Sequence, residues 1–109
     1  MTTDYTPDAI DQALIDAAAG PLLLDFGTNW CGWCRSARPL VDEIVAAHPL
    51  LRHVRIEDGP GRRLGRRYRV RHWPTLVLLS GGEERARVVR PGARDDLAPL
   101  LAHLDSQPE

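Results

Sequence analysis

The chain has 109 residues, of which 43% are hydrophobic and 27% are charged, and its formal net charge is −1. This length is that of one domain, and the composition is typical of a soluble protein with an ordinary hydrophobic core, so we expect a single domain over residues 1–109. No hydrophobic run approaches the ~20 residues of a membrane span, so the sequence predicts no transmembrane segment.

The charged residues are unevenly distributed along the chain. The first twenty residues carry four aspartates and no basic residue, the opposite of the positive start of a secretory signal peptide, so we expect a cytoplasmic protein. All 14 basic residues are arginines, and eight of them lie in residues 52–71. The near-neutral total charge predicts no nucleic-acid partner, and the lack of a long hydrophobic run predicts no membrane partner. We interpret the arginine-rich stretch as a solvated surface rather than a site for an acidic partner.

The first predicted elements are a helix and a buried strand. Thr6-Pro7-Asp8 provides a hydroxyl cap, a proline and an acid, as at a helix start, and hydrophobic residues recur at helical spacing until Gly20-Pro21. Leu22–Gly27 is an almost continuous hydrophobic run, which is typical of a strand covered on both faces. Its one acid, Asp25, is therefore expected to be buried.

A second helix is predicted over about Cys31–Ala47, with a kink at Pro39. Residues 51–57 alternate weakly between hydrophobic and polar, as in a strand. Strand, helix and strand of these lengths form a βαβ unit, whose crossover is almost always right-handed.

The rest of the chain is predicted to add a hairpin and two helices. A turn and a short arginine-rich helix are expected over residues 59–68. Strands at 75–80 and 84–90 are joined through Gly81-Gly82, which is a hairpin signal. The last helix has two acids at its positive end and a hydrophobic stripe formed by Leu97, Leu100, Leu101 and Leu104.

The two cysteines lie three residues apart as Cys31-Gly32-Trp33-Cys34, a spacing that indicates redox chemistry or a metal site. Cys31 lies at the start of the predicted second helix, where unpaired N–H groups and the helix dipole stabilise a thiolate. We therefore predict that Cys31 is the nucleophile and that Cys34 attacks the resulting mixed disulfide. Asp25, buried just before this site, is the predicted group that takes and returns protons.

Zinc binding is the alternative for the cysteines, because Cys31, Cys34, His48 and His53 satisfy a loose two-Cys two-His spacing. In a zinc finger, however, both histidines lie on one helix and the cysteines flank a hairpin turn. Here Pro49 interrupts the segment between the histidines, and the cysteines open a helix. We therefore expect no metal site.

Five motifs together resemble the thioredoxin family. They are Asp25-Phe26, Trp30-Cys31-Gly32-x-Cys34, Pro39, Trp73-Pro74-Thr75 and Gly92, and their order and spacing are those of thioredoxins over about Pro21–Leu104. The resemblance implies an α/β thioredoxin fold, with a central mixed β-sheet flanked by helices in a single domain. It also implies that Pro74 is a cis proline facing the cysteines, next to backbone that pairs with an extended substrate.

The resemblance implies a thiol:disulfide oxidoreductase, a protein-disulfide reductase without a cofactor beyond the redox-active pair. The implied partners are protein disulfide substrates and a dithiol-reducing reductase, and we expect a monomer. Two alternatives stay open: a protein disulfide oxidase or isomerase, and a redox-silent binding module that uses a tryptophan rim and the arginine patch. The residues implied to bind substrate are Trp30, Gly32, Trp33, Trp73, Pro74 and Gly92.

Several residues depart from the family pattern. Trp33 stands where thioredoxins usually have proline, Gly27 where they have a further tryptophan, and the first strand of the family is barely present in Thr2–Thr6. We expect the N–H of Trp33 to reach the Cys31 sulfur and to make the pair more oxidising than a thioredoxin. The three tryptophans are expected to form an apolar docking rim around the sulfurs.

Two expectations concern the buried acid. Arg55 lies where the family often has a lysine near this acid, but we favour a solvated position for it, because arginine is rarely buried. Since a buried carboxylate is costly, we also expect Asp25→Asn to stabilise the fold at neutral pH.

Overall fold

A four-stranded mixed β-sheet forms the centre of the computed structural model, which describes residues 4–106. The strand order is β2-β1-β3-β4, with β1 parallel to β2 and antiparallel to β3, and with β3 antiparallel to β4. The sheet therefore combines a βαβ unit with a hairpin, as predicted. The strands are β1 (Pro21–Gly27), β2 (Arg52–Glu57), β3 (Thr75–Ser80) and β4 (Glu83–Val89).

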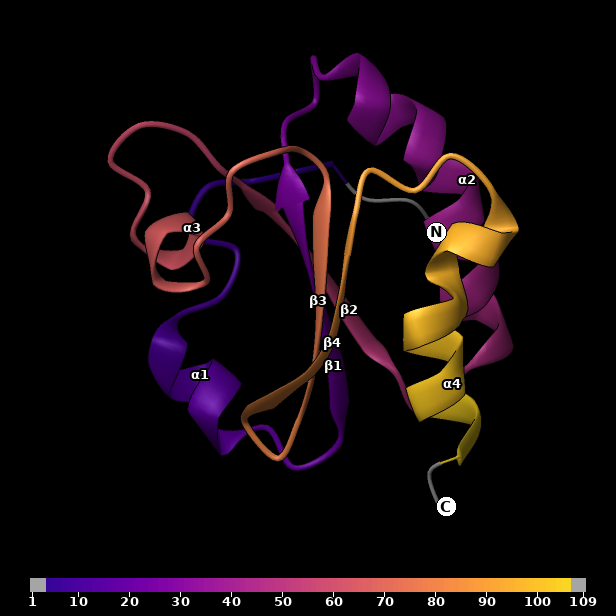
Figure 1. The fold of residues 1–109 in the computed structure, drawn as a ribbon. Coiled ribbons are helices and arrows are strands. Elements are labelled where there is room, and N and C mark those ends of the chain that lie inside the picture. The colour runs from indigo at the N-terminus through magenta and orange to yellow at the C-terminus, as the bar shows by residue number, and fades with distance from the viewer. Residues whose placement is uncertain (1–3, 107–109) are drawn as a thin grey trace.

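Helices cover both faces of the sheet (Figure 1). On one face lie α1 (Gln12–Ala17) and α3 (Arg63–Arg67). On the other lie α2 (Gly32–Ala47) and α4 (Ala98–Ser106), the latter preceded by the short 3-10 helix η1 (Arg94–Leu97). Among residues 4–106, no helix has the length and hydrophobicity to cross a membrane.

Alternation along β1 distributes its side chains between the two layers of helices. Leu22, Leu24 and Phe26 belong to the hydrophobic cluster that also contains Ile15. Leu23 belongs to the cluster formed with residues of α2 and α4. Because successive side chains of a strand point to opposite faces, Asp25 lies on the same face as Leu23, beneath α2. Asp25 is 1% exposed, which confirms its predicted burial.

The start of the first helix was predicted too early. Asp11 caps α1, and its side chain accepts the N–H of Leu14 at 2.9 Å. Thr6 instead pairs with the sheet: its carbonyl accepts the N–H of Glu57 at 2.9 Å, in an isolated parallel bridge to Ile56. The backbone of Thr6 therefore serves the sheet edge and cannot open a helix. Thr2 and Thr3, which were expected to belong to the same first strand, lie outside the described residues.

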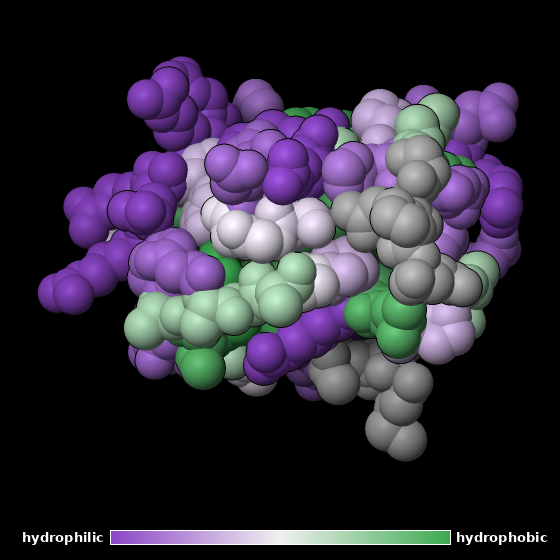
Figure 2. Space-filling view, turned by 90° about the horizontal axis from the view of Figure 1, so that it is seen from below, coloured by the Kyte–Doolittle hydropathy of each residue, from purple (hydrophilic) through white to green (hydrophobic). Residues whose placement is uncertain are grey.

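The start of α2 and the end of β1 lie at one end of the molecule (Figure 1). Figure 2 shows the opposite end, where hydrophilic residues cover much of the surface and hydrophobic residues lie in separate areas. The cysteines therefore lie at the end of the molecule where the buried strand β1 is followed by α2.

The hairpin turn between β3 and β4 has Gly81 and Gly82 at φ angles of 60° and 79°, which favour glycine at both positions.

Candidate active site

Both cysteines lie in the first turn of α2. Cys31 is the N-cap residue, and its Sγ accepts the N–H of Cys34 at 3.2 Å. Cys31 is partly exposed, whereas Cys34 is buried, and both are free thiols. This is the predicted position at a helix start. The N–H that reaches the Cys31 sulfur is, however, that of Cys34, where the sequence analysis assigned this bond to Trp33.

The environment of Cys34 keeps it protonated. Burial raises the pKa of the Cys34 thiol to about 12, and the hydrogen bond and charge of Cys31 act in the same direction. Hydrogen bonds from the backbone of Thr28 and the hydroxyl of Tyr5 oppose this rise without reversing it. Cys34 is therefore a thiol at neutral pH, and it must lose a proton before it can attack a disulfide.

Asp25 is the centre of a buried polar cluster. Its Oδ1 accepts the Tyr5 hydroxyl at 2.6 Å. Its Oδ2 accepts Nε of Arg55 at 3.1 Å and lies 3.1 Å from Nε2 of His53. Arg55 also donates to Oδ1 of Asp42 on α2 at 3.0 Å. The carboxylate is thus buried together with a cation and two further polar groups.

Arg55 is 3% exposed, so the prediction of a solvated position is wrong. The parallel register places Arg55 directly beside Asp25, and the carboxylates of Asp25 and Asp42 flank its guanidinium. Burial acts to lower the pKa of Arg55, but these carboxylates outweigh it and leave the pKa raised. The ion pair therefore allows an arginine to occupy an interior position.

Gly27 is explained by close packing above the cysteines. A Cβ at this position would lie 2.6 Å from Sγ of Cys34 and 2.9 Å from Cζ of Tyr5. The space that a tryptophan would need is therefore filled by the sulfur and by the Tyr5 ring, which is 3% exposed. No sequence motif identified Tyr5 as part of the site. The signal was the glycine itself, because a small residue at a normally large position indicates that another side chain fills the site.

The loop before β3 lies against Cys31. The Trp73–Pro74 peptide is cis, as the resemblance implied, and Pro74 is buried. The Trp73 carbonyl oxygen lies 3.9 Å from Sγ of Cys31 and accepts Nε of Arg90 at 3.0 Å. The guanidinium of Arg90 lies over the Trp33 ring, 5.2 Å from its centroid. Arg90, which the sequence analysis did not single out, thus joins the cysteine helix to the proline loop.

The three tryptophans differ in exposure. Trp30 and Trp33 are 68% and 53% exposed on either side of Cys31. Trp73 is half-buried, and its Nε1 donates to Oδ2 of Asp58 at 2.8 Å. Two exposed rings therefore border the partly exposed thiol, while the third is anchored.

Two predicted glycines have no side chain to contribute, and their surroundings differ. Gly32 is exposed, and a Cβ there would meet no atom within 4 Å. The N–H of Gly92 donates to Oδ2 of Asp96 at 2.8 Å, which ties the loop after β4 to η1. Gly92 is thus held by a contact to the following helix.

The histidines of the zinc alternative have separate partners. Nδ1 of His48 lies 2.8 Å from the Ile44 carbonyl oxygen, and Nε2 lies 2.9 Å from Oδ1 of Asp105 on α4. His53 contacts Asp25 instead. Within residues 4–106, no group of three or more His, Cys, Asp or Glu side chains is arranged to hold a metal ion.

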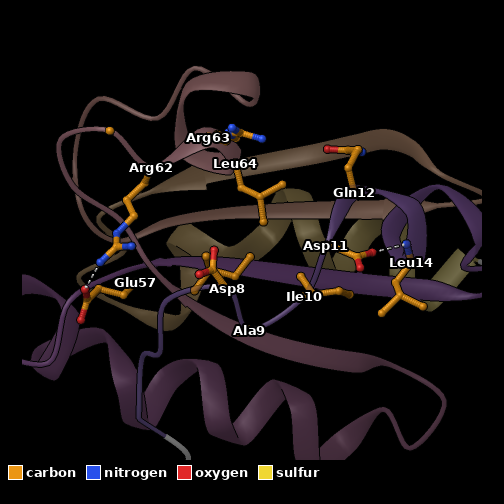
Figure 3. Close-up of a pocket in the computed structure, with 12 residues that line it drawn as sticks. Asp8, Ala9, Ile10, Asp11, Gln12, Leu14, Glu57, Arg62, Arg63 and Leu64 are labelled. Atoms are coloured by element: carbon orange, nitrogen blue, oxygen red, sulfur yellow. Dashed lines mark hydrogen bonds and ion pairs between the residues drawn. The ribbon is translucent and has the colours of Figure 1, made fainter.

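A pocket of about 650 Å³ lies on the face of α1 and α3 (Figure 3). One side of the pocket is lined by Asp8, Ala9 and Ile10, and the facing side by Arg62, Arg63 and Leu64. Arg62 is itself paired with Glu57 at 3.0 Å. None of the predicted site residues lines this pocket, so it is separate from the cysteine site.

Comparison with known proteins agrees with the geometry. The Thioredoxin family model matches residues 2–103. Thioredoxin 1 of Nostoc sp. is 32% identical over 97 residues, covering 88% of this chain and 90% of that protein. A thioredoxin of Chlamydia pneumoniae is 36% identical over 84 residues, covering 77% and 82%.

A solved structure gives a similar result. Thioredoxin 2 from Pseudomonas aeruginosa PAO1, in its reduced form, superposes with a TM-score of 0.81 at 47% identity, covering 95% of this chain and 96% of that one. The α/β fold, the thiol pair at the start of α2 and the cis proline beside it lead to one conclusion. The chain belongs to the thioredoxin family and carries the paired thiols of a thiol:disulfide oxidoreductase.

Proposed function

We propose that this protein reduces disulfide bonds in other proteins. The observation that supports this most is the contrast between the two thiols: Cys31 is partly exposed at a helix N-terminus, and Cys34 is buried behind it. An exposed nucleophile with a buried partner can attack a large substrate first and resolve the complex afterwards. The exposed rings of Trp30 and Trp33 provide apolar surface on which such a substrate can dock.

The reaction has two exchange steps. In the first, the Cys31 thiolate attacks one sulfur of the substrate disulfide, a mixed disulfide forms, and the other substrate sulfur leaves as a thiolate. In the second, Cys34 loses its proton and attacks Sγ of Cys31, which releases the second substrate sulfur. The substrate gains two electrons and two protons, and Cys31 and Cys34 become a disulfide. Asp25 receives the proton of Cys34 in this scheme.

The remaining assignments complete the proposal. The backbone beside Pro74 pairs with an extended substrate segment, and the Cys31–Cys34 disulfide is returned to the dithiol by a separate reductase. The protein acts in the cytoplasm as a monomer and needs no cofactor beyond its own thiol pair.

Reduction of insulin disulfides by dithiothreitol tests the proposal. The wild-type protein should accelerate the reaction, and Cys31→Ser should be inactive while keeping its fold. Ser36→Ala, an exposed hydroxyl two residues after Cys34, serves as the control and should be active. A wild-type protein without activity would favour the redox-silent binding module. Equilibration with glutathione then separates a reductase from an oxidase or isomerase by its reduction potential.

A further inference from the structure

We propose that the hydroxyl of Tyr5 relays the proton of Cys34 to Asp25. The inference rests on the proposed function, because it concerns the second exchange step. It adds a residue from the N-terminal segment to a site otherwise built from β1, α2 and the proline loop. Tyr5 is not part of the motifs that identify the family in this sequence.

The position of Tyr5 between the two groups supports the relay. Its hydroxyl donates to Oδ1 of Asp25 at 2.6 Å, and its ring and the Cys34 sulfur both crowd the same point above Gly27. The same hydroxyl lowers the pKa of the Cys34 thiol, in opposition to the effect of burial. The Tyr5 side chain therefore lies next to the thiol that must lose a proton and is hydrogen-bonded to the carboxylate that receives it.

A phenol in this position can pass a proton from one group to another, but it does not stay ionised. Burial, followed by the charge and hydrogen bond of Asp25, raises the pKa of Tyr5 far above the neutral range. Tyr5 therefore stays protonated. Its O–H points to Asp25, and its oxygen has lone pairs left to accept the S–H of Cys34.

Other charged groups face Tyr5 from two elements. Arg55 on β2 lies 5.9 Å from the ring centroid, and Arg38 on α2 lies 6.0 Å from it. Both guanidinium groups are already protonated and have no acceptor atom, so neither can take a proton from the hydroxyl. His53 on β2 contacts the other oxygen of Asp25. Asp25 is thus the acceptor that the hydroxyl reaches.

The relay moves two protons in one step. The Cys34 S–H bond breaks as its proton forms an O–H bond with Tyr5, and the original Tyr5 proton moves to Oδ1 of Asp25. The Cys34 thiolate then forms a disulfide bond with Sγ of Cys31, and the bond from Cys31 to the substrate sulfur breaks. Tyr5 ends as it began, and Asp25 holds the proton until solvent removes it.

Tyr5→Phe tests the relay, because it keeps the ring and removes the oxygen. An aromatic disulfide with a coloured thiol product reports both steps in a single turnover: attack by Cys31 releases the first thiol, and attack by Cys34 releases the second. We expect the first phase to be unchanged and the second to slow about tenfold or more, with an altered pH dependence. The matched control is Tyr68→Phe, whose hydroxyl contacts Gln12 on the other face of the sheet. It should leave both phases unchanged.

Two outcomes with these variants overturn the inference, and a third contradicts the proposed function. A second phase at the wild-type rate would show that the oxygen is not needed. We expect the rate of the second phase to fall equally in Asp25→Asn and in the double variant Asp25→Asn/Tyr5→Phe. A further tenfold fall in the double variant would show that Tyr5 does not act through Asp25. Failure of the wild-type protein to release even the first thiol would instead contradict the proposed function.

The unaltered protein provides an independent test that does not depend on the folding of a variant. The rate of the second phase is measured in mixtures of light and heavy water. Two protons moving together predict a curved dependence of the rate on the fraction of deuterium. A straight line would mean that one proton moves and would overturn the relay.

Discussion

The two sides of the cysteine pair differ in what surrounds each sulfur. On the outer side, Cys31 is bordered by exposed tryptophans and by Arg90, and its nearest polar neighbours are backbone groups. On the inner side, Cys34 is buried near a cluster of titratable side chains centred on Asp25. The outer side has the surface for docking, and the inner side has the groups that move protons.

This difference shows how one helical turn can separate two steps of a reaction. The two thiols are three residues apart, so the same helix start that exposes one buries the other. The sulfur of the exposed thiol accepts an N–H from the first turn of α2. The buried thiol needs a side-chain base, because burial opposes its ionisation.

Replacing the inner thiol should have the largest effect on turnover. In Cys34→Ser, attack by Cys31 continues, but the mixed disulfide is not resolved, because a serine hydroxyl does not attack a disulfide. We expect multiple-turnover activity to fall at least about a thousandfold. Mass spectrometry should find substrate bound to Cys31 in a one-to-one complex. An unbound, active variant would mean that Cys31 is resolved by some other group.

Removing the charge of Asp25 tests the inner cluster through stability. An isolated buried carboxylate at this position predicts that Asp25→Asn stabilises the fold. Because Arg55 pairs with it inside the protein, we now expect the opposite: the free energy of unfolding falls by about 1–3 kcal/mol, with Asp42 compensating part of the loss.

Denaturant unfolding of the reduced protein at neutral pH checks this expectation. Asp4→Asn is the matched control, since Asp4 is an exposed carboxylate, 3.7 Å from Arg38. Its effect should be within about 0.5 kcal/mol. A more stable Asp25→Asn variant would show that the carboxylate is costly despite its partners.

On the outer side, Arg90→Met should affect activity more than stability. Arg90 holds the Trp33 ring and the Trp73 carbonyl, and its charge lies against the same oxygen as the Cys31 sulfur. We expect kcat/KM for insulin to fall about three- to tenfold, as for the loss of one cation–π contact and one hydrogen bond. Arg85→Met, a control substitution within β4, should change kcat/KM less than twofold. Equal effects of the two variants on kcat/KM would show that Arg90 has no specific role in the site.

Substitution of His48, at the far end of α2, should have the smallest effect, and this effect is on stability. The hydrogen bond to Asp105 and that to the Ile44 carbonyl raise the pKa of His48. A raised pKa stabilises the fold below the ordinary histidine value of about 6.5, and this contribution is lost as pH rises through the folded-state pKa. His48→Gln should thus cost more stability in acid than in alkali, by less than about 1 kcal/mol. The exposed His72 is the control, and a His48→Gln cost independent of pH would contradict the assignment.

Local patterns predicted the frame of the site. The continuous hydrophobic run of β1 identified Asp25 as buried, and the chain order of strand and helix placed Cys31 at a helix start. These features depend on neighbours in sequence. The family resemblance supplied the cis proline, which no local pattern could establish, since only about 5% of X-Pro bonds are cis.

The buried partners of Asp25 depend on contacts that sequence does not show. Tyr5 is 20 residues from Asp25, and it reaches the site because Thr6 pairs with the edge of the sheet. Arg55 was expected to be solvated because arginine is rarely buried, and only the strand register places it beside the acid. Arg90 lies beyond the end of β4 at a φ angle of 51°, a local geometry that no motif predicted.

Alkylation of the reduced wild-type protein with iodoacetamide at neutral pH tests the contrast between the thiols most directly. Peptide mapping should find the label on Cys31 and none on Cys34 until the protein is unfolded. Cys34 should also stay unlabelled in Cys31→Ser, because burial, and not competition with Cys31, protects it. Labelling of Cys34 at a rate similar to that of Cys31 in the folded protein would contradict the account.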